Sequence, residues 1–236
     1  MIVSRLLAFI VLAAVFGVGV SMPAAAGEVV FQDTFDRDDA DAPGNDWVSL
    51  GKVVLQGKAV RFVGNEEDFR PRMTHRFPPQ KAGKVRVSFV MDWLRELEKK
   101  WSLHVQLGNS ADMPRLLVRP KDLSKGIGVN LVWGGGEAVG VQPPGSFGYL
   151  KEENFHPLFV VNNKADEKTV VEKPVVTVDV DIDAGTYTVR CNGQAYPDVP
   201  FDNKVPLDTI RFVCVGCGPT GFTKSSIDDV KITRVD

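Results

Sequence analysis

The stretch VTVDVDIDAGTYTVR, residues 176–190, decides the fold class of this chain. Apolar and polar residues alternate over 176–182 and again over 186–190, which is the period of a β-strand with one buried face. The three residues between the runs, 183–185, form a short Gly-containing connection of the kind that joins antiparallel strands. The segment therefore predicts a β-hairpin.

The same alternation recurs along most of the chain. Short runs rich in Val, Thr and aromatic residues are separated by Gly, Pro, Asn and Asp, and no convincing helix interrupts them. The pattern predicts strands over 53–55, 59–63, 72–77, 85–93, 101–107, 115–119, 127–133, 158–161, 175–182, 186–191, 209–215 and 227–235. Antiparallel strands in this number predict an all-β domain, either a two-sheet sandwich or a barrel.

One further hairpin is expected between the runs 85–93 and 101–107. The charged connection over 94–100 is either a turn or one to two turns of helix. Each run has one apolar face and one more polar face, so paired side by side they would place their polar residues together.

Residues 1–26 have the three-part pattern of a secretory signal. Arg5 precedes an apolar run over 6–20, and three alanines, 24–26, stand before Gly27. An uncleaved anchor is the alternative, but a run of about 15 residues is shorter than the roughly 20 that span a bilayer. We therefore expect cleavage, a mature domain over 27–236, and a secreted or periplasmic protein without membrane attachment.

The composition limits the classes of partner that we expect the protein to bind. The 236 residues are 44% hydrophobic, which is enough for one substantial core. Lys and Arg number 28 against 30 Asp and Glu, so the chain lacks the basic excess of a general nucleic-acid binder. We do not expect nucleic acid as a partner.

The chain has three cysteines, Cys191, Cys214 and Cys217, so at most one disulfide can form within it. The C-x-x-C pair follows a strand-like run, whereas a thioredoxin-like redox pair begins a helix. Structural thiols or one disulfide are expected, with redox chemistry and metal binding as alternatives. The pairing stays open.

Several short motifs resemble the concanavalin A-like jelly rolls, the superfamily of legume lectins, laminin G-like modules and family 16 glucanases. FQDTFDR at 31–37 with NDW at 45–47 resembles the opening of these domains, and IDDVKI at 227–232 resembles their last strand. Residues 183–189 and Asn192-Gly193 resemble their late hairpin. The resemblance covers the mature chain and implies two curved antiparallel sheets packed face to face, with the terminal strands paired.

The resemblance also implies a structural Ca²⁺. Its ligands would be the main-chain oxygens of Thr34 and Gly57 and the Asp228 carboxylate, and oxygen ligands suit this cation. The alternative is that Asp228 and Asp229 discourage pairing at an exposed strand edge.

The sequence does not match the catalytic patterns of two enzyme classes of the superfamily. The glucanases use a Glu-x-Asp-x-x-Glu strand, which this chain lacks, and Glu96 and Glu98 stand beside Lys99 and Lys100 as on a solvated face. Lyase-like relatives use Arg, Gln, His and Tyr on the concave sheet, but their spacing does not match. We assign no catalytic residue.

A carbohydrate site is expected on the concave sheet. His104 and Gln106 share one face of a strand, and Arg86 with Ser88 would lie on the matching face of its hairpin neighbour. Trp133 ends a strand before three glycines and is the expected sugar-stacking ring.

The function that these expectations favour is an exported, non-catalytic module that binds a polysaccharide or other glycan. A polysaccharide-degrading enzyme, preferably a lyase using the same patch, is the first alternative. A structural or adhesive module of the cell envelope is the second, because fold alone does not decide function.

Overall fold

The computed structural model describes residues 27–63, 70–93, 102–113, 125–134, 146–151, 154–160, 173–191, 193–215 and 222–235. The expected signal over 1–26 and the residues Glu96, Glu98, Trp101 and Cys217 lie outside the described residues, and so does the strand expected over 115–119.

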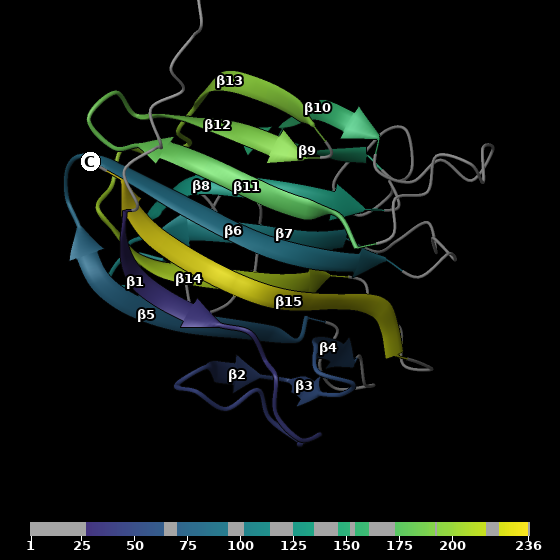
Figure 1. Ribbon diagram of the computed structural model, residues 1–236. Helices are drawn as coiled ribbons and strands as arrows, with labels where there is room; N and C mark the ends of the chain where they lie inside the picture. Colours follow the sequence, from purple (N-terminus) through teal and green to yellow (C-terminus); the bar gives the residue numbers. More distant parts are fainter. Residues whose placement is uncertain are drawn as a thin grey trace, which may run out of the picture.

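Fifteen strands make up the described part of the chain (Figure 1). They are β1 Glu28–Asp33, β2 Val48–Leu50, β3 Lys52–Leu55, β4 Val60–Val63, β5 Arg72–Gln80, β6 Lys84–Trp93, β7 Ser102–Gly108, β8 Ile127–Gly134, β9 Ser146–Lys151, β10 Asn154–Val160, β11 Val175–Asp181, β12 Thr186–Cys191, β13 Gln194–Pro200, β14 Leu207–Val215 and β15 Phe222–Val235. The described residues hold no helix of the length and apolarity needed to span a membrane.

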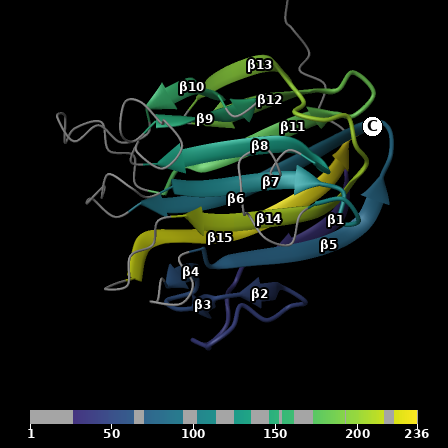
Figure 2. The same ribbon diagram turned by 180° about the vertical axis from the view of Figure 1, so that it is seen from behind.

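The strands form two antiparallel sheets packed face to face. The eight-stranded sheet has the order β13-β12-β11-β6-β15-β4-β3, with β1 added along β15. The seven-stranded sheet has the order β10-β9-β8-β7-β14-β5-β2 and faces the viewer in Figure 2. The predicted all-β sandwich is confirmed, and so is the expected pairing of the first and last strands.

The core lies between the sheets and is built by the alternation seen in the sequence. Val85, Val87 and Phe89 of β6 point into it from one sheet, and Phe212 of β14 meets them from the other. The rings of Phe89 and Phe212 stand edge to face with centroids 5.4 Å apart. Trp47 is also buried there.

The hairpin predicted over residues 176–190 is confirmed as β11 and β12. Val178 stands opposite Val189, and Val180 opposite Tyr187. Gly185 has φ +70°, a backbone conformation that glycine adopts without the Cβ clash of other residues. Its N–H donates to the Asp181 carbonyl, which closes the turn.

The hairpin predicted between 85–93 and 101–107 is wrong. β6 pairs with β11 and β15 in the eight-stranded sheet, whereas β7 pairs with β14 and β8 in the other sheet. Both strands do bury one apolar face, but they bury it from opposite sides of the same core. Alternation shows which face a strand buries and does not show which strands are its neighbours.

Asp33 at the end of β1 is a buried carboxylate with several donors around it. It accepts hydrogen bonds from the Phe35 backbone N–H at 2.9 Å and from the Trp47 indole at 2.9 Å. The Arg37 guanidinium binds it through two nitrogens, at 2.7 and 3.0 Å. Burial by itself would raise the pKa of Asp33, but the hydrogen bonds from Arg37, Phe35, Asn45 and Trp47 outweigh it and lower the pKa.

Replacing Asp33 by Asn should therefore cost stability in a pH-dependent way. The variant keeps the side-chain shape but loses the charge, and we expect a loss of about 2 kcal/mol at neutral pH. Because the pKa of Asp33 is lowered on folding, its stabilisation is present above about pH 4 and is lost as the pH falls further. Urea unfolding at neutral pH and near pH 3 measures both effects.

The matched control is Asp198→Asn, since Asp198 is exposed on β13. The control should match wild type at both pH values. An Asp33→Asn protein as stable as the control at neutral pH would contradict this account.

Candidate functional site

The outer face of the seven-stranded sheet carries the residues that strand alternation turns away from the core. In β7, Leu103 and Val105 point into the core, so His104 and Gln106 lie on the outer face. The predicted placement of His104 and Gln106 on one face of a strand is confirmed. The same alternation places Arg211 of β14 and Thr74 of β5 on this face.

The strand register aligns these residues in a polar row that crosses four strands. Thr74 is opposite Arg211, Arg211 is opposite Gln106, and Gln106 is opposite Asn130 of β8. At about 4.8 Å per strand, the row is about 14 Å long. Val48 of the edge strand β2 extends it beyond Thr74.

A second row runs beside the polar row, two residues further along each strand. It consists of Leu50, Arg72, Val213, His104 and Val132, each opposite the next. His104 thus lies between two apolar neighbours, and Arg72 lies nearer the sheet edge.

The two central residues of this face are buried yet incompletely hydrogen-bonded. His104 is 1% exposed and its Nε2 lies 3.1 Å from the Ser102 hydroxyl. Gln106 is 0% exposed and donates from Nε2 to the Asn130 side chain at 3.4 Å. Neither Nδ1 of His104 nor Oε1 of Gln106 has a hydrogen-bond partner among the residues that the structure describes. Buried polar atoms rarely stay without partners, so both atoms indicate a ligand or ordered water.

His104 is neutral near pH 7. Burial, and then the positive charge of Arg70, lower the pKa of its imidazole to about 4. Asn130 acts weakly in the opposite direction, although no hydrogen bond of normal geometry joins it to the ring. A neutral imidazole has one donor and one acceptor nitrogen, which suits hydroxyl ligands.

An open groove lies next to these rows, over β2, β5 and β14. Its volume is about 1240 Å³. The lining residues are Phe31, Gln32, Asn45, Asp46, Val48, Ser49, Leu50, Arg72, Thr74, His75, Arg76, Ser110, Ala111, Met113, Thr209 and Arg211. Ligand sites are concave surfaces of this kind with a few polar groups, so the groove and the two rows form the candidate site.

Arg86, expected beside His104, lies on the other sheet. Its neighbours on β6, Val85 and Val87, point into the core, so Arg86 faces outward from the eight-stranded sheet. There it forms an ion pair with Asp179, which also binds Arg190 at 3.0 Å. The sandwich separates Arg86 from His104, and the expectation of a shared site is wrong.

Trp133, expected to stack on a sugar, is 0% exposed and belongs to the core. Alternation in β8 continues through its end, and Trp133 is opposite the core residue Leu103. A ring in that position cannot stack on a sugar at the surface.

The sequence reasoning missed Arg72, Thr74 and Arg211. Their strands were predicted, and alternation could have assigned each to the face opposite Met73 and Phe212. Only the register shows that this face is shared with Gln106 and His104, because β14 separates β5 from β7.

Solved structures share this architecture. No protein-family model matches the sequence, and no curated protein matches it. A sialidase matches with a TM-score of 0.60 at 13% identity, over 89% of this chain and 19% of that chain. The CBM2 module of the evolved Dit of Lactobacillus casei BL23 phage J-1 matches with a TM-score of 0.59 at 10% identity, over 89% and 98%. A legume lectin-like domain from Entamoeba histolytica matches with a TM-score of 0.51 at 11% identity, over 81% and 91%.

This chain has the concanavalin A-like jelly-roll fold. Its eight-stranded sheet carries both terminal strands, and its seven-stranded sheet carries the candidate site. The chain spans 19% of the matched sialidase, so that likeness concerns one domain of a larger protein.

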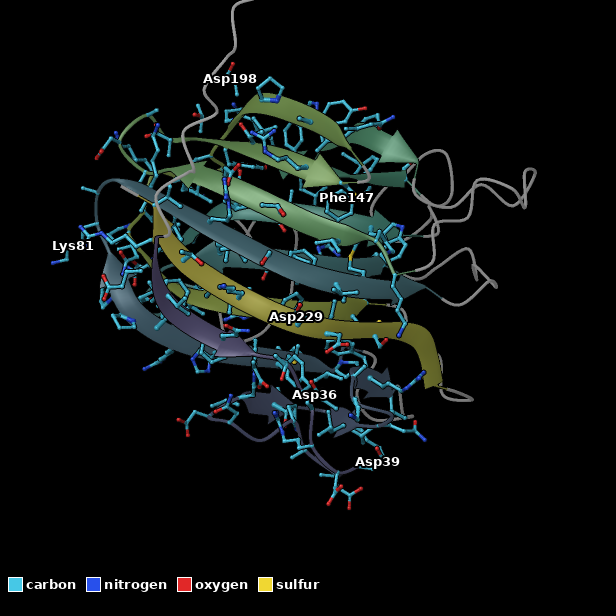
Figure 3. All side chains as sticks on the ribbon, viewed as in Figure 1. Asp36, Asp39, Lys81, Phe147, Asp198 and Asp229 are labelled. Atoms are coloured by element: carbon cyan, nitrogen blue, oxygen red, sulfur yellow. The ribbon has the colours of Figure 1, made fainter. Side chains whose placement is uncertain are left out.

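In this jelly roll, the residues expected to bind Ca²⁺ come from segments that meet at one corner. Thr34 follows Asp33, which is opposite Val230 of β15, and Gly57 lies in the turn between β3 and β4. Figure 3 shows Asp229 on β15 and Asp36 below it in the view. Burial raises the pKa of Asp228, and the charges of Asp229 and Asp36 act in the same direction.

The donor set at this corner fits Ca²⁺ through main-chain oxygens together with the single carboxylate of Asp228. Among the described residues, no three His, Cys, Asp or Glu side chains are grouped to hold a metal. The Gly57 N–H donates a hydrogen bond to the Asp39 carboxylate at 2.8 Å, and the Gly57 carbonyl is the oxygen expected to bind the cation. A cation here would relieve the repulsion around Asp228.

The state of His104 predicts a stability change between pH 7 and pH 4. The pKa of His104 is lowered to about 4 on folding, so the unfolded chain binds its proton first and stability falls as the pH drops below about 6.5. The full effect is about 3 kcal/mol. Urea unfolding of wild type and His104→Gln at several pH values should show a flatter profile for the variant.

The exposed residue His156 supplies the control. His156→Gln should keep the wild-type profile. Equal profiles for wild type and His104→Gln would show that His104 is not the group responsible.

Proposed function

We propose that the protein is an exported, non-catalytic module that binds carbohydrate on the outer face of its seven-stranded sheet. The observation that carries the proposal is a pair of buried atoms, Nδ1 of His104 and Oε1 of Gln106, that have no hydrogen-bond partner among the described residues and lie on the sheet face that borders an open groove. A sugar hydroxyl both donates and accepts, so it can satisfy these atoms at once.

The remaining groups of the site suit a sugar chain. Thr74 and Asn130 add a hydroxyl and an amide along the polar row. Val48 and Leu50 expose apolar surface at the edge of the sheet, and such surface packs against the carbon faces of a pyranose. Similar structures include the carbohydrate recognition domain of Emp47p and the phage CBM2 module, which supports a glycan ligand.

A binding role is favoured over catalysis by the residue types present. Of the described residues on the two rows, none is a carboxylate or a tyrosine, so His104 has no second proton-transferring group beside it in that set. A lyase that uses this face is the alternative, and the electrophoresis experiment described below distinguishes it from a binding module.

Export is supported by the signal-like residues 1–26 and by the disulfide bond of Cys214. Cys191 is a free, buried thiol whose pKa burial raises to about 12. The module would then be secreted or periplasmic, with neither membrane nor nucleic acid as a partner.

Native electrophoresis through gels cast with single polysaccharides tests the function. Retarded migration over intact polymer is expected for at least one of a panel of neutral and acidic polymers. His104→Ala should weaken the apparent affinity about two- to tenfold, the value of one hydrogen bond. Thr74→Val, which removes one half-buried hydroxyl, should act in the same direction and tests the face if His104→Ala does not fold.

His156→Ala is the matched control and should migrate like wild type. A cleared zone with unsaturated, ultraviolet-absorbing ends would show a lyase instead. Unretarded migration on every polymer would contradict carbohydrate binding and favour a structural module.

We further propose that Ca²⁺ stabilises the corner formed by Thr34, Gly57 and Asp228. A ligand that binds only the folded state at a hundred times its Kd adds about 2.7 kcal/mol. In a domain of this size, that amount raises the Tm by about 5–10 °C. Thermal unfolding in EDTA and in excess CaCl₂ should differ by this amount for wild type and not for Asp228→Asn. Identical melting in both solutions would contradict the site.

A further inference from the structure

Three arginines line the groove from two neighbouring strands. Arg72 and Arg76 are four residues apart on β5, hence about 13 Å apart along one face. Arg211 lies between them on β14, because it is opposite Thr74. The three side chains form a triangle around Thr74 on a single wall of the groove.

Two of these guanidinium groups are held in a desolvated setting. Arg72 is 8% exposed and Arg211 is 6% exposed. Burial, and then the like charge of Arg72, lower the pKa of Arg211 to about 10, which leaves it charged at neutral pH. Two positive charges this close and this buried attract an anion far more strongly than the same charges in water.

The other described lining residues add little negative charge. Asp46 is the acidic side chain among them, and its carboxylate lies on the segment before β2. Arg76 is exposed, so its guanidinium is accessible to a ligand in the groove. A guanidinium presents five N–H donors in a planar fork, so it can bind a carboxylate or sulfate through two atoms while keeping its other contacts.

Apolar surface lies beside the arginines in the same groove. Val48 is 71% exposed and Leu50 is 47% exposed, and both lie on the edge strand β2 directly beside β5. A ligand that fits this groove has anionic groups for the arginines and apolar surface for Val48 and Leu50. A sugar ring that carries an acidic substituent has both.

We propose that this groove binds an acidic polysaccharide, with Arg72, Arg76 and Arg211 binding its carboxylate or sulfate groups. The inference rests on the proposed carbohydrate-binding function and names the class of ligand. The acidic substituents lie over β5 and β14, and the hydroxyls of the same chain lie along the polar row from Thr74 toward Gln106.

Three soluble polymers distinguish the sources of the negative charge. Polygalacturonate carries carboxylates, dextran sulfate carries sulfates, and dextran is neutral. Affinity electrophoresis should show retardation by at least one acidic polymer and much weaker retardation by dextran. Because the contacts are charged, retardation should fall as NaCl rises from about 0.05 to about 0.5 M.

Charge-removing variants locate the binding surface. Arg211→Gln should reduce the affinity for the acidic polymer at least about tenfold, the value of a hydrogen bond to a charged group. Arg76→Gln, at an exposed position where folding is not at risk, should reduce it about three- to fivefold. Arg86→Gln is the matched control, because it removes an outward-facing arginine from the opposite sheet and should leave the affinity unchanged.

Each other result overturns a defined part of the account. Equal binding of dextran and the acidic polymers, unchanged in Arg76→Gln and Arg211→Gln, would overturn the acidic ligand and leave the proposed carbohydrate binding intact. An equal loss in Arg86→Gln would show non-specific attraction and overturn the groove as its site. Binding to none of a wide panel of polymers would overturn the proposed function itself.

Discussion

The buried carboxylate of Asp33 is the interaction on which the path of the chain between the two sheets depends. Asp33 ends β1 in the eight-stranded sheet, and its hydrogen bonds hold Phe35, Arg37 and Trp47 in the next turns of chain. Trp47 directly precedes β2, the edge strand of the seven-stranded sheet. The buried carboxylate is tolerated because Phe35, Arg37 and Trp47 all donate hydrogen bonds to it. These bonds fix the place where the chain crosses from one sheet to the other.

This crossing also shapes the candidate site. The chain that Asp33 anchors supplies Asn45, Asp46, Val48 and Leu50, which line the groove at the edge of the sheet. Further lining residues come from the neighbouring strands β5 and β14, whose apolar faces are held by the core between the sheets. The packing of apolar side chains between the sheets therefore positions the strands that form the groove. The residues on the outer faces of these strands determine its chemistry.

The centre and the edge of the seven-stranded sheet differ in polarity and in burial. At the centre, His104 and Gln106 are buried and neutral, and each has one polar atom without a hydrogen-bond partner in the described part of the chain. Towards the edge, arginines and exposed apolar side chains stand around open space. Neutral hydrogen-bonding groups at one end and positive charge at the other are suited to different substituents of one extended ligand.

Local pattern was enough to predict much of this molecule. Period-2 alternation located most of the strands and the 176–190 hairpin, and it assigned His104 and Gln106 to one face, because the side-chain period of a strand is a property of a few consecutive residues. The neighbours of each strand were decided by the tertiary structure. Arg86 lies outside the expected site and Arg211 lies within it because strand pairing joins residues that are far apart in the chain. Trp133 is buried because the two sheets share one core.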